Sequence, residues 1–101
     1  MPPIYLPAED SFLLLKVLEK EIPKLIKKNQ HLQFLEIGSG SGIILETVQK
    51  LGIKREHLFG VDVNQQAVSH CRSLGFNCIY SNLFENVSGK FNMIVFNPPY
   101  L

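Results

Sequence analysis

The sequence predicts an α/β fold, in which the strands of one parallel sheet alternate with helices. Three observations predict it: short apolar segments alternate with segments of helical periodicity, glycines stand at the junctions, and the last apolar segment is almost free of polar residues. The 101 residues are 46% hydrophobic and 19% charged, a composition that indicates one small packed domain or part of one, and argues against a disordered tail or a coiled coil. We therefore expect parallel strands joined by right-handed crossovers.

Charge and cysteine usage narrow the class of protein further. Ten Lys and Arg residues oppose nine Asp and Glu residues, so a formal net charge of +1 supplies no basic field that would attract nucleic acid. Cys71 and Cys78 lack a zinc-binding spacing, and we expect both to be buried as small hydrophobic residues, with no metal site. Without a signal-like start or a long uncharged apolar run, the sequence indicates a soluble cytoplasmic protein with no membrane segment.

Residues 1–31 are predicted to form a strap and a helix. Prolines occupy three of the first seven positions, which favours an extended backbone. A helix is expected from Ala8, where acidic and capping residues precede apolar residues at helical spacing, namely Phe12, Leu15, Leu18 and Ile22. Pro23 should stop or kink this helix, with room for one more turn before a polar linker at residues 27–31.

Residues 32–101 are predicted to form the alternating core. The expected strands are residues 32–37, 58–63, 77–80 and 91–96, and the expected helices are residues 43–51 and 65–74. Gly52 and Gly75 follow the two helices, where glycine commonly ends a helix. Because residues 91–96 are almost wholly apolar, this strand should lie in a sheet that is covered on both faces.

The segment from Glu36 to Gly42 is the first candidate site, because it joins a strand to a helix. Its glycines allow a ligand to approach the backbone, and the helix that follows presents unpaired N–H groups. The spacing differs from a dinucleotide fingerprint, since the third glycine comes one position early and Ile43 takes its place. An ordinary strand-to-helix turn is the alternative.

Asp62 is the second candidate, at the end of the second strand. It stands 24 positions after Gly38, where nucleotide-binding sheets place a carboxylate that accepts hydrogen bonds from the ribose hydroxyls. This pairing fits an adenosine-containing ligand. Alternatively, Asp62 caps the helix that begins near Gln65, and Asn64 is a further candidate for that cap.

The third candidate is the segment Asn97-Pro98-Pro99-Tyr100, which follows the fourth strand at the carboxyl edge of the sheet. Proline has no N–H donor, so the Asn97 side-chain oxygen and the Pro98 carbonyl can act as a pair of acceptors. Such a pair suits a planar NH2 group, on which the ring of Tyr100 can stack. A proline-rich turn is the alternative.

These motifs resemble the class I S-adenosylmethionine-dependent methyltransferases, and within them the HemK-like protein glutamine methyltransferases. The resemblance covers almost the whole chain. Residues 7–14, Pro-Ala-Glu-Asp-Ser-Phe-Leu-Leu, resemble the amino-terminal signature of the eukaryotic and archaeal branch, which methylates class I translation termination factors on the glutamine of their Gly-Gly-Gln loop. Ser11 stands where family members usually have Thr, and Asn82 stands where they usually have Asp.

The resemblance implies a cofactor, S-adenosyl-L-methionine, and methyl transfer to the side-chain amide of a glutamine in a release factor. The implied cofactor-binding residues are Glu9, Asp10, Ser11, Glu36, Gly38, Gly40, Gly42, Asp62, Val63, Asn82, Leu83 and Asn97. The implied catalytic residues are Asn97, Pro98 and Tyr100. An alternative acceptor is an exocyclic amine of adenine or cytosine in DNA or RNA, and a third interpretation is a cofactor-binding fragment without turnover.

The resemblance also implies the Rossmann-like fold of class I methyltransferases. Four of the family's seven strands are expected here, in the order three-two-one-four, so residues 1–101 would form the N-terminal half of one domain, with the core at residues 32–101 and the C-terminus incomplete. The fourth strand would then be an exposed edge, open to self-association or to a companion chain. A small zinc-binding activator protein is expected to pair along residues 77–80.

Overall fold

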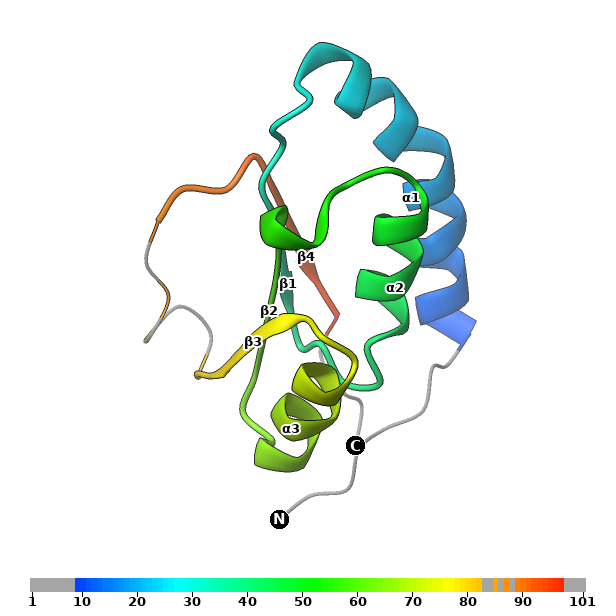
Figure 1. Ribbon diagram of the computed structural model, residues 1–101. Coiled ribbons are helices and arrows are strands. Elements are labelled where there is room, and N and C mark those ends of the chain that lie inside the picture. The colour runs from blue at the N-terminus through cyan, green and yellow to red at the C-terminus, as the bar shows by residue number, and fades with distance from the viewer. Residues whose placement is uncertain (1–8, 83–84, 86, 88, 98–101) are drawn as a thin grey trace.

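Four parallel strands form one sheet. The computed structural model describes residues 9–82, 85, 87 and 89–97. The strands are β1 (Phe34–Ile37), β2 (Leu58–Asp62), β3 (Asn77–Tyr80) and β4 (Met93–Phe96), and their order in the sheet is β3-β2-β1-β4. The helices are α1 (Glu9–Lys28), α2 (Ile43–Lys50) and α3 (Gln65–Ser73), with a short 3-10 helix at Arg55–His57. The predicted alternation and the predicted strand order are both confirmed (Figure 1).

Strands β1 and β4 each begin two residues later than the sequence predicts. Asn92 is the reason, because its side-chain Oδ1 accepts a hydrogen bond from the Gln33 N–H at 2.8 Å. The backbone N–H groups of Asn92 and Met93 both donate to the Gln33 carbonyl, at 2.9 and 3.2 Å. Regular pairing therefore starts at Phe34 opposite Met93. The other strands and the helices α2 and α3 end within one residue of their predicted bounds.

Helix α1 continues through Pro23 to Lys28, so the predicted stop at this proline is wrong. Pro23 is exposed, and the half-buried Leu25 and Ile26 beyond it pack against the core. Burial of these side chains favours the extra turns, although Pro23 lacks the N–H of a helix hydrogen bond. The axis bends in the cyan, C-terminal part of the helix, which agrees with the predicted kink (Figure 1). Lys27 lies in the last turn rather than in a linker.

All three described helices cover the same face of the sheet. Side chains at alternating strand positions, such as Phe34, Leu58 and Val95, join the helices in the main hydrophobic core. Helix α1 packs on α2, α2 packs on β2, and α3 packs on β2 and β3 (Figure 1). Cys71 on α3 and Cys78 on β3 are both buried in this core, which confirms the prediction that they are buried.

The opposite face of the sheet carries a smaller apolar cluster that no described helix covers. Its members are Leu35, Ile37 and Val61, with Phe59, Val87 and Phe91 packed against them. Phe59 and Phe91 meet edge to face, with ring centroids 5.4 Å apart. Ile94 and Phe96 of β4, which are opposite Leu35 and Ile37 in register, are 49% and 56% exposed. Strand β4 is the edge of the described sheet, as the strand order predicts, so the prediction that both of its faces are covered is wrong for the described residues.

Candidate functional site

The carboxyl ends of three strands bring the predicted segments to one edge of the sheet. Strand β1 ends at Ile37 before the glycine loop, β2 ends at Asp62, and β4 ends at Phe96 before Asn97. Helices α2 and α3 both begin at this edge (Figure 1). This edge is where open α/β sheets bind ligands.

The remaining predicted residues are placed only in part. Glu9, Asp10 and Ser11 belong to the first turn of α1, which lies at the same end of the molecule as the glycine loop (Figure 1). Leu83, Pro98 and Tyr100 lie outside the described residues.

The glycine loop has a backbone that only glycine adopts readily. Its glycines are Gly38, Gly40 and Gly42, with φ of 85°, 50° and 84°. A Cβ on Gly42 would also lie 2.9 Å from Leu74 Cδ1, so a larger residue before α2 would have to displace the end of that leucine side chain. The N–H groups of Gly38 and Ser39 donate to the Val61 carbonyl at 2.8 and 3.1 Å. These bonds hold the loop against β2 in one shape.

Asp62 is buried at the end of β2, and its carboxylate receives two backbone N–H groups. Oδ2 accepts from Gly40 at 3.0 Å and Oδ1 accepts from Asn64 at 2.9 Å. Asp62 therefore joins the glycine loop to the start of α3. Asn64 is the N-cap of α3, since its Oδ1 accepts from the Gln66 and Ala67 N–H groups at 2.9 and 3.4 Å. Of the two predicted caps, Asn64 is confirmed and Asp62 is wrong.

Glu36 and Asn97 meet between the neighbouring strands β1 and β4. Glu36 is completely buried, and its Oε2 accepts a hydrogen bond from Asn97 Nδ2 at 3.3 Å. Its Oε1 is buried without a hydrogen-bond partner among the described residues. Burial raises the pKa of Glu36 well above its usual range, the hydrogen bond from Asn97 opposes this rise, and Cys71 and Asp62 add to it. The site thus contains a carboxyl group that can still accept a hydrogen bond from a ligand.

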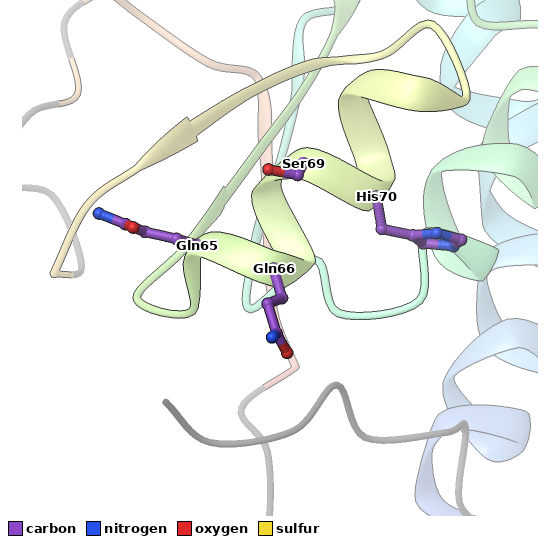
Figure 2. A pocket seen from close by; sticks show the side chains of 4 residues that line it. All are labelled: Gln65, Gln66, Ser69 and His70. Carbon is purple, nitrogen blue, oxygen red and sulfur yellow. The ribbon is translucent and has the colours of Figure 1, made fainter.

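Sequence analysis missed an open pocket on the first turns of α3. It is lined by Gln65, Gln66, Ser69 and His70 (Figure 2). His70 points toward the loop that precedes α2, and its Nε2 donates to the Ser41 carbonyl at 3.0 Å, because a carbonyl oxygen can only accept. The pocket therefore adjoins the glycine loop. Its signal in the sequence is weak, since polar residues on an exposed helix face are ordinary.

The geometry of this edge defines the class of protein. A parallel sheet in this order, with a glycine loop after β1 and a carboxylate at the end of β2, is a Rossmann-like domain, a class in which this edge of the sheet commonly binds nucleotides. Comparison with known proteins gives the family: the chain belongs to the methyltransferase small domain family, whose model matches residues 9–101. No group of three or more His, Cys, Asp or Glu side chains that could hold a metal ion occurs in the described part of the chain.

Individual relatives agree with this family. The chain is 43% identical over 106 residues to a putative protein N5-glutamine methyltransferase of Methanocaldococcus jannaschii, covering 99% of this chain and 49% of that protein. It is 32% identical over 111 residues to a release factor glutamine methyltransferase of Haemophilus influenzae, covering 95% of this chain and 38% of that protein. The predicted resemblance to HemK-like protein glutamine methyltransferases is confirmed.

A solved structure supports the fold. The crystal structure of a Thermoplasma acidophilum protein matches 85% of this chain and 55% of its own length, with a TM-score of 0.59 at 19% identity. The chain spans about half or less of the length of the curated relatives described above.

Proposed function

We propose that the chain belongs to an enzyme that transfers a methyl group from S-adenosyl-L-methionine to the side-chain amide of a glutamine in a translation release factor. The similarity to two glutamine methyltransferases supports this acceptor. The observation that carries the proposal is the contact of Glu36 with Asn97 beside the glycine loop. It sets a buried carboxyl group and an amide at the edge of the sheet where a cofactor and an acceptor can meet.

The described residues fit S-adenosyl-L-methionine. Glu36 Oε1, which is buried and has no partner in the described part of the chain, can accept from the ammonium group of the methionine part. Each Asp62 carboxylate oxygen carries a second lone pair beyond the one that receives a backbone N–H, so Asp62 keeps acceptors for the ribose hydroxyls. Val63 and Asn82, which are both exposed, would flank the adenine together with Leu83.

When bound, the sulfonium group of the cofactor supplies the methyl group. The task of this chain is to hold the acceptor amide in line with it, because an amide nitrogen is a weak nucleophile whose lone pair is delocalised. Asn97 Oδ1 and the Pro98 carbonyl would accept hydrogen bonds from the amide NH2 group, and Tyr100 would stack on the amide plane.

The proposal extends to partners and location. Strand β3 is the other edge of the described sheet, and its Ile79 and Tyr80 are exposed, which supports pairing with a small zinc-binding activator protein. A complex that survives gel filtration would support this partner, and no binding at micromolar concentration would refute it.

None of the described helices is both long and apolar enough to span a membrane. A cytoplasmic location stays a proposal drawn from the family.

Calorimetric titration with S-adenosylhomocysteine tests the cofactor part of the proposal. We expect the wild-type chain to bind, and Asp62→Asn to bind about 10-fold or more weakly because it loses a charged acceptor. Glu56→Gln, which changes an exposed carboxyl group far along the chain from the glycine loop, is the control and should bind like the wild type. Equal affinity of all three chains would contradict the assigned site.

Turnover with a release factor and with RNA then tests the acceptor. Methylation of the release factor glutamine supports the proposal. Methylation of a nucleobase amine in the RNA would favour the alternative acceptor. Cofactor binding without turnover on either acceptor would favour a cofactor-binding fragment.

A further inference from the structure

Two of the hydrogen bonds that Asn97 forms have different effects on the residue. Its backbone N–H donates to the Ile37 carbonyl at 2.8 Å, which continues the pairing of β4 with β1 by one residue. Its side-chain Nδ2 donates to Glu36 Oε2 at 3.3 Å. The backbone hydrogen bond fixes the position of the Asn97 main chain, and the side-chain hydrogen bond restricts the rotation of its amide group.

We propose that Glu36, in its ionised form, is a positioning residue that fixes which way the Asn97 amide faces. A side-chain amide has its donor and its acceptor on opposite sides of one carbon, and its last torsion is roughly two-fold. An ionised carboxylate only accepts hydrogen bonds, so it selects the NH2 end of Asn97. Because the amide is planar, Asn97 Oδ1 then faces away from Glu36.

Fold stability does not explain a carboxyl group at this position. Glu36 is 0% exposed, and no Lys, Arg or His side chain of the described residues forms an ion pair with it. Burial of a carboxylate without a cation is costly, and a neutral side chain of the same size would fill the space at lower cost. A buried carboxyl group that lowers fold stability and contacts a residue of the site is typical of a side chain retained for function.

The charge of Glu36 determines which end of the Asn97 amide faces it. A protonated Glu36 has an O–H donor as well as an acceptor, so it can hold the Asn97 amide in either orientation. The groups that face Glu36 are Asn97 just after β4, Asp62 from β2 and Cys71 from α3, none of which is a cation. The surroundings therefore favour the neutral form, and the selection should strengthen as the pH rises and Glu36 ionises.

The consequence for catalysis rests on the proposed function. In the proposed function, Asn97 Oδ1 accepts a hydrogen bond from the NH2 group of the substrate glutamine. A reversed Asn97 amide would turn its own NH2 group toward that NH2 group, so the hydrogen bond would be lost and the glutamine would lose its orientation. Glu36 would then act through Asn97 without touching the acceptor.

Side-chain amide resonances in the isotope-labelled full chain test the orientation without turnover. The Asn97→Asp variant assigns the Asn97 resonances by their disappearance. We expect the two Nδ2 protons to follow the ionisation of Glu36 in a pH titration, and to lose this dependence in Glu36→Gln. Asn92, whose Oδ1 accepts from Gln33, is the internal control and should give the same resonances in both chains.

Two results would overturn the proposal. One is an Asn97 amide with the same resonances and the same pH dependence in the wild type and in Glu36→Gln. The other needs the wild type alone, so it holds even if the variant does not fold: Asn97 amide protons that stay constant while the carboxyl carbon of Glu36 titrates.

A double-mutant cycle connects the contact to turnover. We expect Glu36→Gln to lower kcat about 10- to 100-fold by misplacing the acceptor, and to lower it far less in the Asn97→Ala background. The affinity for S-adenosylhomocysteine is measured in parallel, because a lost cofactor contact of Glu36 would appear there. Equal losses of kcat in both backgrounds would show that Glu36 does not act through Asn97. A wild-type chain that neither binds nor transfers would refute the proposed function, while the resonances would still decide the positioning.

Discussion

The carboxyl group of Glu36 is buried in the folded chain and exposed to water in the unfolded chain. Its pKa is raised in the folded state, mainly by burial, so the folded chain keeps this proton at pH values where the unfolded chain has lost it. The contribution of Glu36 to stability is therefore most favourable below the unfolded pKa of about 4.3. It is lost as the pH rises through the folded pKa.

The variant Glu36→Gln should remove this dependence. We expect it to exceed the wild type in free energy of unfolding by about 1–3 kcal/mol at a pH of about 8, where the carboxyl group of the unfolded wild type is ionised and folding must either bury that charge or take up a proton, and to match it at a pH of about 4. Urea denaturation at the two pH values measures the difference. Glu56→Gln, at an exposed carboxyl group, is the control and should change neither value. Equal stability of Glu36→Gln and the wild type at the higher pH would contradict the prediction.

The sequence predicts where the residues of the site lie along the strands, but it does not predict which of them contact one another. The sequence puts Glu36, Asp62 and Asn97 at strand ends, because the alternation of apolar segments shows where strands stop. The hydrogen bond between Glu36 and Asn97 joins residues 61 positions apart, and it depends on the register of β1 with β4. That register follows the side chain of Asn92, whose hydrogen bond to Gln33 no local pattern predicts.

At the scale of elements, α3 depends on its N-cap. Asn64 Oδ1 satisfies two N–H groups that the helix itself leaves without partners. We expect Asn64→Ala to lower the free energy of unfolding by about 0.5–2 kcal/mol, measured by urea denaturation. Asn64→Asp keeps an acceptor at the same position and serves as the matched control, with little or no loss. Equal losses in both variants would show that the cap does not stabilise the helix.

Pro23 limits α1 from within. The residue is exposed and lacks an N–H, so the helix loses one hydrogen bond in its last third. We expect Pro23→Ala to raise the free energy of unfolding by about 1–2 kcal/mol, after the greater flexibility of the unfolded variant is subtracted. Lys24→Ala, at the next exposed position, is the control and should change stability little. A Pro23→Ala chain no more stable than the wild type would contradict this account.

The same proline shows why element bounds are only partly predictable. Local chemistry places a stop or a kink at Pro23, yet the helix continues because Leu25 and Ile26 pack against the core. Where tertiary packing agrees with local signals, as at the glycines after α2 and α3, the bounds follow the sequence within one residue.

At the scale of the whole molecule, the sheet has one face covered by helices and one face covered only in part. The sequence predicts four strands and their order, but the apolar run of β4 indicates burial that the described residues do not provide. The apolar composition of a strand predicts that its side chains are buried, but it does not predict which element buries them. Within the described sheet no strand pairs with the outer edge of β4, and Ile94 and Phe96 are exposed beside this edge.

This edge should make the 101-residue chain self-associate as its concentration rises, because a second copy can pair along β4 and cover both apolar side chains. Sedimentation equilibrium measures the average mass. We expect the double variant Ile94→Lys with Phe96→Lys to stay monomeric, since charged side chains oppose pairing at an edge. The double variant Leu13→Lys with Val17→Lys is the matched control, because these residues of α1 are 58% and 55% exposed, similar to the pair on β4. It should associate like the wild type, and dissociation of the α1 variant alone would place the contact on the helix instead.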